Sequence, residues 1–262
     1  MSRTEQYRAH LQQLCDWEFY LLAESRLPGS RANLELAQAV ADEGDEIQFR
    51  RWLALDATAA PPNTPGEFLP LCGAIGLGRL LAEGDGAVLP ALRAAAADSR
   101  WRVREGVAMA LQRWGAADMD ALLMAMTEWA NGNRYEQRAA VAGLCEPLLL
   151  RYPTMAERIL VILDGIMATV PGAADRRGDG FVALRKALGY GLSVAAVAAP
   201  PSGLALLARW EAIDDPDVRW IVRQNWAKKR MGKIAGGRGS RGEREKGRKK
   251  GLGKWLCGRR TG

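Results

Sequence analysis

The stretch Asp98-Ser-Arg-Trp-Arg-Val-Arg-Glu-Gly-Val-Ala108 recurs 119 positions later as Asp217-Val-Arg-Trp-Ile-Val-Arg-Gln-Asn-Trp-Ala227. Both stretches read D-x-R-W-x-V-R-x-x-φ-A, where φ is an apolar residue, and they share six identities in eleven positions. A chain that resembles itself in this way is usually an array of one supersecondary unit. The duplication therefore predicts a repeat architecture, although it does not reveal a ligand.

Two weaker copies lie between the strong ones, and an arginine marks all four. The four arginines are Arg104, Arg138, Arg185 and Arg223, at intervals of 34, 47 and 38 residues. Three of them follow an aspartate by six positions, namely Asp98, Asp179 and Asp217. The second copy has Gly132 at that place. We interpret the copies as helical hairpins, because a single hairpin cannot bury its apolar face and must share it with neighbours.

An Asp followed after five and six residues by an apolar residue and an Arg resembles the signature of HEAT repeats, over residues 85–231. The resemblance implies a right-handed α-solenoid of stacked antiparallel helix pairs. It also implies that the aspartates and arginines form a hydrogen-bonded ladder between successive pairs, while the apolar residue points into the shared core.

The composition agrees with an all-α fold. Apolar residues make up 48% of the 262 residues, and they recur at spacings of three and four rather than two, as in Val103, Val107, Ala110, Leu111 and Trp114. We predict about ten to twelve helices in one HEAT-like domain over residues 1–231, followed by a tail over 232–262. The expected helices span 3–24, 30–43, 47–55, 64–83, 87–97, 99–114, 118–131, 134–151, 154–170, 179–198, 202–213 and 216–230.

Two of these helices have clear start signals. Ser30 is a candidate N-cap for the second helix. Thr64-Pro-Gly-Glu67 reads as a capping box with proline in the first helical position. The helix that follows contains Gly73, Gly76 and Gly78, and each glycine costs about 1 kcal/mol relative to alanine. Close approach of another helix is the expected reason for them.

The net charge of +7 belongs to the C-terminal segment rather than to the body of the protein. Residues 228–262 hold 14 of the 37 Lys and Arg but only 2 of the 30 Asp and Glu, which leaves 23 basic and 28 acidic residues before them. A nucleic-acid groove carries a basic stripe on folded surface. A mildly acidic body argues weakly against such a groove and leaves a local basic cluster open.

The tail, residues 232–262, contains 10 glycines among Lys and Arg. Because it offers little apolar surface to bury, we expect it to be disordered. Two interpretations stay open: a basic arm for nucleic acid or anionic surfaces, and a reading-frame extension without a role.

Several site classes find no support in the sequence. The four cysteines are scattered and read as reduced thiols, and His10 is the only histidine, so we expect no metal site, no histidine-dependent catalysis and no cofactor. The start of the chain does not read as a secretory signal, and we expect a cytoplasmic protein. Residues 187–208 are uncharged, but Pro200-Pro201 interrupts them, so a buried helix is favoured over a membrane span.

The repeat arginines and aromatic residues are the candidate binding residues. Arg104, Arg138, Arg185 and Arg223 could line a concave face and hold phosphates or carboxylates, but we favour ion pairs with the ladder aspartates. Trp101 and Trp220 could stack on a base or anchor a peptide, but packing on the neighbouring unit is favoured.

Two further segments resemble the helical-repeat DNA alkylation repair glycosylases. Phe181-Val-Ala-Leu-Arg-Lys-Ala-Leu-Gly-Tyr-Gly-Leu-Ser193 is similar to the family's K-A-(I/L)-G-W-A-L-R-E helix, and Trp101-Arg-Val-Arg104 is similar to its W-x-x-R segment. In that family aromatic, Arg and Asp residues line a cleft around the lesion. Here Tyr190 stands where the family has Trp, Ser193 stands where it has Arg, and its acidic residue has no counterpart.

The favoured function is a non-catalytic binding or scaffold protein that presents a concave helical surface to a macromolecular partner, most simply a protein. The alternative is a DNA-binding protein related to the glycosylases, which would use the concave face or the basic tail. A third possibility is a lyase-type repeat protein that acts on a chromophore or small ligand in a deep pocket. A membrane is not among the expected partners.

Overall fold

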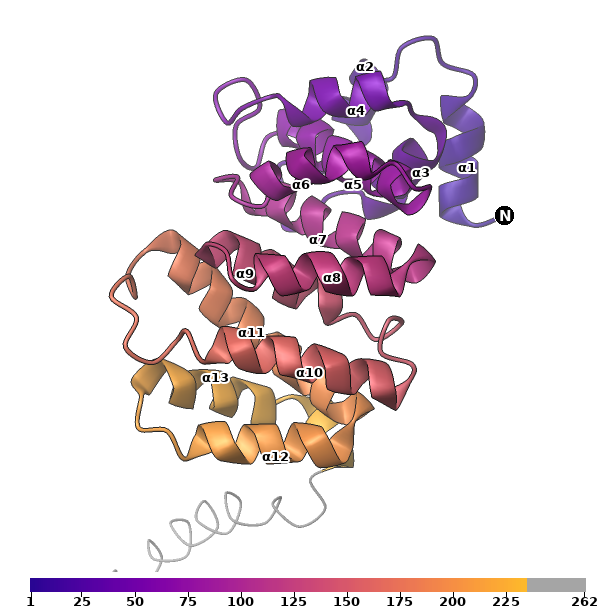
Figure 1. Ribbon diagram of the computed structural model, residues 1–262. Helices are drawn as coiled ribbons and strands as arrows, with labels where there is room; N and C mark the ends of the chain where they lie inside the picture. The colour runs from indigo at the N-terminus through magenta and orange to yellow at the C-terminus, as the bar shows by residue number, and fades with distance from the viewer. Residues whose placement is uncertain (235–262) are drawn as a thin grey trace, which may run out of the picture.

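Helices account for all regular secondary structure in residues 1–234, which are the residues that the computed structural model describes (Figure 1). This part of the chain contains thirteen α-helices, one more than the upper end of the expected range, and three short 3-10 helices. The α-helices are α1 (Arg3–Leu11), α2 (Glu18–Glu24), α3 (Leu34–Glu43), α4 (Glu46–Leu53), α5 (Phe68–Ala82), α6 (Leu89–Ala95), α7 (Trp101–Ala117), α8 (Met119–Trp129), α9 (Arg134–Leu144), α10 (Pro153–Met167), α11 (Asp179–Ala198), α12 (Pro200–Glu211) and α13 (Pro216–Trp226).

From α6 onward the helices form two layers. Helices α8, α10 and α12 lie one beside the next in the front of Figure 1, and they form what we call the outer layer. Helices α5, α7, α9, α11 and α13 pack in succession behind them and form the inner layer. Helices α9, α11 and α13 each contact the outer helix that precedes them in the chain, and α7 contacts α6 in the same way. One continuous apolar core runs between the layers, with Trp52, Phe68, Trp129 and Phe181 fully buried in it.

Two expected helices are shorter than the apolar periodicity predicted. The first stops at Leu11 and resumes at Glu18, because the Trp17 indole N–H donates to the Leu11 carbonyl (3.0 Å) and so ends α1. Helix α9 ends at Leu144 rather than near 151. The reason is local: Pro147 has no N–H to continue the helix and restricts the residue before it.

Both predicted start signals were wrong in detail. Asn33, not Ser30, caps α3, and its side chain accepts from the Leu36 N–H (3.3 Å). Thr64 makes no capping bond, and Pro65–Glu67 form a 3-10 turn before α5. Glu67 is buried, and its carboxylate accepts from the Asn63 backbone N–H (2.7 Å) and from Arg102 rather than from the Thr64 N–H of a capping box.

The glycines of α5 do mark close helix contacts, as predicted. A Cβ on Gly73 would lie 2.6 Å from the Phe49 carbonyl oxygen, and one on Gly78 would lie 2.4 Å from the Ala110 Cα. A Cβ on Gly76 would overlap the Phe49 ring. Helices α4 and α7 therefore pack directly against the backbone of α5, at glycines that have no side chain to keep them apart.

Helix α11 is the one described helix that is long and apolar enough to cross a membrane by length and composition. Of its apolar window, 56% is buried inside the fold, against α9, α10, α12 and α13. The apolar segment that the sequence shows is divided at Ala199, where α12 begins with Pro200 and Pro201.

The fold continues slightly beyond the expected domain boundary. Helix α13 ends at Trp226, a 3-10 helix spans Lys229–Lys233, and Met231 is buried in the core. The expectations for the tail over 232–262 fall almost entirely on residues 235–262, which lie outside the described residues.

Candidate functional site

One rung of the predicted ladder is present. Arg185 on α11 and Asp217 on α13 form an ion pair (2.5 Å from Nη1 to Oδ1), with both side chains largely buried. Arg176, which the sequence analysis missed, also donates to Asp217 (2.6 Å) and to Asp215 (2.5 Å). These contacts connect α13 to α11 and to the loop that precedes α11.

The rung at Asp98 is a correction. The Asp98 carboxylate does not accept from Arg104; it accepts from the Arg100 side chain (2.7 and 2.9 Å) and from the Arg100 backbone N–H (2.7 Å). Arg100 is nearly fully buried and also donates to the carbonyls of Leu55, Asp56 and Ala60. Because Arg100 lies only two residues away in a capping turn, it takes both carboxylate oxygens of Asp98.

The remaining ladder residues do not form rungs either. Asp179 and Arg223 are exposed and make no ion pair within residues 1–234. Arg138 on α9 donates to the Arg104 carbonyl (2.6 Å) and to Glu105 (3.0 Å), both on α7. Arg138 thus links neighbouring inner helices, with a glutamate in place of the predicted aspartate.

The two strong sequence copies occupy different positions on their helices. Trp101 is the first residue of α7 and is 49% exposed, whereas Trp220 is the fifth residue of α13 and is partly buried. Trp220 is therefore not in a first turn as expected. It packs on Gly189 and under Arg185 (4.6 Å to the ring centroid), both of which belong to the neighbouring inner helix α11.

A groove of about 570 Å³ opens across the first turns of α7, α9 and α11, and we call it the inner groove. Its lining joins four of the predicted residues, Trp101, Arg104, Arg138 and Asp179, to two that were missed, Tyr135 and Lys186. The remaining lining residues are small or apolar: Ala97, Ser99, Val182, Ala183 and Ala187. A cavity of this size is within the usual range for ligand sites.

Arg104 lies at the centre of the groove's chemistry. Its Nη1 donates to the carbonyl oxygens of Asp98 (2.5 Å) and Ser99 (2.9 Å), and its guanidinium lies 5.4 Å from the Tyr135 ring centroid. Burial, followed by the nearby charge of Arg138, lowers the pKa of Arg104 from its ordinary value. No carboxylate within residues 1–234 hydrogen-bonds to this guanidinium.

Tyr190 lies away from the inner groove, although it also belongs to α11. Its ring is 48% exposed and lies beneath Lys228 (5.4 Å) and Arg230 (4.4 Å), and Arg230 donates to its hydroxyl (2.7 Å). Arg185 is likewise engaged, by Asp217 and Trp220. Tyr190 and Arg185 are therefore not brought together with Trp101 and Arg104.

A sequence signal for Tyr135 was present. Trp101, Tyr135 and Trp220 each stand three residues before a repeat arginine, which places aromatic ring and guanidinium on one helix face. Lys186 follows Asp179 and Ala183 at helical spacing on α11, and the residue types alone did not single it out.

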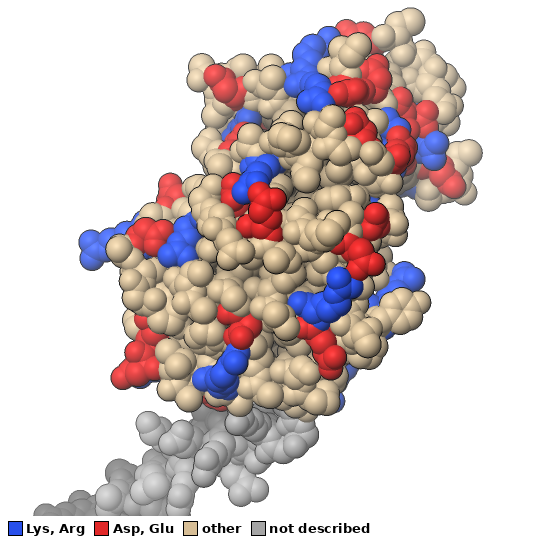
Figure 2. Space-filling view, viewed as in Figure 1, with Lys and Arg blue, Asp and Glu red and all other residues tan. Residues whose placement is uncertain are grey.

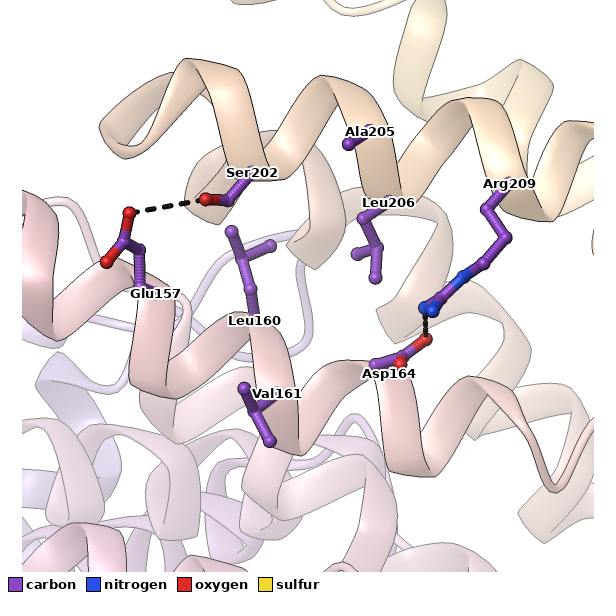
Figure 3. Close-up of a pocket in the computed structure, with 8 residues that line it drawn as sticks. All are labelled: Glu157, Leu160, Val161, Asp164, Ser202, Ala205, Leu206 and Arg209. Carbon is purple, nitrogen blue, oxygen red and sulfur yellow. Dashed lines mark hydrogen bonds and ion pairs between the residues drawn. The ribbon is translucent and has the colours of Figure 1, made fainter.

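A second groove, of about 520 Å³, lies between the outer helices α10 and α12 (Figure 3). Its polar side chains pair across it: Ser202 donates to Glu157 (3.2 Å), and Arg209 forms an ion pair with Asp164. Leu160 and Leu206 lie between these two pairs. This groove fastens α10 to α12 and leaves its own polar groups satisfied.

The outer face has no concentrated charge. Figure 2 shows it in the orientation of Figure 1, with Lys, Arg, Asp and Glu scattered over a largely uncharged surface. No group of three or more His, Cys, Asp or Glu side chains in the described part of the chain is placed to hold a metal ion.

Comparison with known proteins found no matching family model, no similar curated protein and no similar solved structure.

Proposed function

We propose that this protein is a non-catalytic, HEAT-like binding protein, a right-handed α-solenoid whose inner groove holds an extended segment of a protein partner. The observation that carries the proposal is the lining of the groove. Three successive inner helices contribute aromatic rings, cations and an aspartate around small residues, so a chain laid across them would meet both charge signs and apolar surface. Exposed aromatic and arginine side chains are the typical anchors of protein interfaces.

The chemistry of the lining suits binding. Its ionisable groups are Arg104, Arg138, Lys186, Asp179 and Tyr135, and no histidine or thiol is among them. The successive contacts of α5, α7, α9, α11 and α13 support the solenoid, since stacked helix pairs of this kind expose one extended inner surface.

The proposal can be tested with a peptide library selected on the full-length protein, followed by hydrogen–deuterium exchange with a selected peptide. We expect slower exchange in residues 101–108, 134–141 and 179–190. Replacing Ala183, which lines the inner groove, with Trp should abolish binding because the indole fills the groove. The matched control is Ala205→Trp, in the groove between α10 and α12. Loss of binding in the control alone would move the site to the outer layer.

Binding of DNA is the second candidate, because Trp101 and Arg104 match the glycosylase-like segment and line the same groove. Phosphate-dominated binding weakens steeply as salt rises. Salt-dependent duplex binding that Ala183→Trp abolishes in the full-length chain would favour this function. Duplex binding that both tryptophan variants retain would lie outside either groove.

A further inference from the structure

The free edge of the Arg104 guanidinium is the most specific chemical feature of the inner groove. Both hydrogen bonds of this side chain come from Nη1, and they anchor the head on the Asp98 and Ser99 carbonyls. Within residues 1–234, Nε and Nη2 donate to no partner. Both atoms remain accessible to solvent. Nε and Nη2 together form one side of the planar fork, which matches the two oxygens of a carboxylate.

Two neighbouring carboxylates are engaged by other arginines. Asp98 is held by Arg100, and Glu105 is held by Arg138 (3.0 Å). Arg104 therefore has no carboxylate hydrogen-bonded to its guanidinium, and burial followed by the charge of Arg138 lowers its pKa, while Asp98 and Asp179 act in the opposite direction through space. An anion that enters the groove would compensate a desolvation cost that the folded chain already bears.

Lys186 adds a second free cation on the opposite wall of the groove, because it is exposed and forms no ion pair among the described residues. Asp179 also lines the groove and forms no ion pair among the described residues. A phosphate backbone presents a charge at every nucleotide and would meet this carboxylate, whereas a peptide can bring one anion and offer an N–H group to Asp179. The arrangement therefore favours an acidic peptide over a nucleic-acid strand.

Two aromatic rings line the groove together with Arg104. The Trp101 ring is held by Arg102, 4.5 Å from its centroid, and nearly half of the Trp101 side chain stays exposed. The Tyr135 ring lies against Arg104 itself. An apolar or aromatic side chain next to the anion would have a rigid surface to pack on.

We propose that the inner groove recognises a peptide carboxylate through the Nε and Nη2 edge of Arg104, with Lys186 as the second cation and an adjacent apolar side chain on Trp101. This inference rests on the proposed function and specifies the chemistry of the partner. The carboxylate could belong to an Asp or Glu side chain or to the C-terminus of a chain, and the two sources can be separated by experiment.

The test uses the full-length protein and four synthetic probes, with binding followed by calorimetry and by the NMR signal of the Arg104 Nε–H group. The first pair is acetyl-Ala-Ala-Trp-Glu-Ala-Ala-amide and its Gln counterpart; the second is acetyl-Ala-Ala-Ala-Trp with a free or an amidated C-terminus. We expect at least one acidic probe to shift the Arg104 signal and to bind about tenfold or more tightly than its neutral counterpart. The pair that shows this difference identifies the source of the carboxylate.

Variants separate recognition from folding. Arg104→Lys keeps the charge but loses the fork, and should weaken the acidic probe about tenfold, while the exposed Lys186→Gln should weaken it several-fold. Arg209→Lys, in the groove between α10 and α12, is the matched control and should bind the acidic probe as the parent does.

Equal binding of acidic and neutral probes would overturn the inference, and so would unchanged binding by Arg104→Lys. Tighter binding of adenosine monophosphate than of the acidic probes would also overturn it. Library peptides that bind in the groove with neither an acidic residue nor a free C-terminus would overturn only this inference and leave the proposed function intact.

Discussion

Glu67 and Arg102 form an ion pair that is almost completely shielded from water. The carboxylate oxygen Oε2 lies 2.8 Å from Arg102 Nη1, and Glu67 is fully buried. Arg102 also donates to Asn63 (3.2 Å) and to the Gly29 carbonyl, so one guanidinium joins α7 to two loops of the N-terminal half. Oε1 of Glu67 and Nε of Arg102 have no partner among residues 1–234, which leaves the pair incompletely satisfied.

Removing one partner of this pair should be strongly destabilising, since it leaves an uncompensated buried charge. We expect Glu67→Leu to lower the free energy of unfolding by roughly 3–5 kcal/mol. Glu67→Leu combined with Arg102→Met should cost clearly less than the sum of the two single variants, as measured by urea unfolding in a double-mutant cycle. Strictly additive effects would show that the two charges do not depend on each other.

The cysteines differ in reactivity because they differ in exposure. Burial raises the pKa of the Cys145 thiol to about 12 and raises that of Cys72 well above its ordinary value. Cys15 is exposed, in the segment between α1 and α2. Because the thiolate is the reactive form, the two buried thiols should be inert.

Thiol titration checks this expectation. In a Cys257→Ser variant at pH 8, a disulfide reagent should modify only Cys15 in the native protein, and Cys72 and Cys145 should react once denaturant is added. A second rapidly reacting thiol in the native state would show that the core around α5 or α9 opens readily.

At the scale of elements, close contact between α5 and its neighbours depends on glycine. The same helix would be more stable in isolation with alanine at each of these positions, so the glycines are explained by tertiary packing alone. The helix ends follow a different cause. Side chains of Asp45, Asp118, Asn133 and Asp215 accept from first-turn N–H groups and begin their helices locally.

Gly78→Ala and Gly165→Ala should change stability in opposite directions. The added Cβ at Gly78 would lie 2.4 Å from the Ala110 Cα, and we expect a loss of about 1–3 kcal/mol. Gly165 is exposed on α10 with no atom near an added Cβ, so its substitution should gain about 0.5–1 kcal/mol. Thermal and urea unfolding measure both variants. A stabilising Gly78→Ala would mean that α5 and α7 separate without cost.

At the scale of the whole molecule, ion pairs repeatedly join one hairpin to the next. Arg93 bonds to Glu136, Arg138 to Glu105, Arg209 to Asp164, and Arg176 to Asp215. The partners stand 33 to 45 residues apart, which is close to the interval between repeat arginines. Most of these pairs are partly exposed. They should contribute more to the alignment of one hairpin on the next than to the free energy of unfolding.

The pair between Arg176 and Asp215 should make the C-terminal hairpin sensitive to acid. The hydrogen bonds from Arg176 lower the pKa of Asp215, with smaller contributions from the backbone N–H groups of Val218 and Asp217. A carboxyl whose folded-state pKa is lowered contributes stability above its unfolded-state pKa of about 4, and that contribution is lost as the pH falls through the folded-state value. Asp215→Asn should therefore show a shallower loss of stability between about pH 5 and pH 2.

Urea unfolding across this pH range tests the prediction. Asp214→Asn is the matched control, because the Asp214 pair with Arg219 is solvent-exposed on both sides. Its pH profile should follow that of the parent. If the profile of Asp215→Asn also follows it, the Arg176 contact does not contribute to acid stability.

The sequence alone was sufficient for the helical class and for most helix positions, because apolar spacing at three and four and local capping act within one turn. It also singled out Trp101, Arg104 and Arg138 as binding candidates and Asp179 as a ladder residue, and these four residues line one groove. The helix count and the ends of the first helix and of α9 were predicted less well. The Trp17 indole and Pro147 end these helices while the apolar spacing continues.

Only the tertiary structure decided which charges pair. The repeat spacing predicted that the aspartates pair with repeat arginines, but the turn before α7 pairs Asp98 with Arg100, and one edge of Arg104 stays open. Glu67 forms a buried ion pair and Arg176 a partly buried one, and no local pattern marks either, since their partners lie 35 to 41 residues away. Electrostatic partners are chosen by distance in space and by desolvation, and both are set when helices from distant parts of the chain pack together.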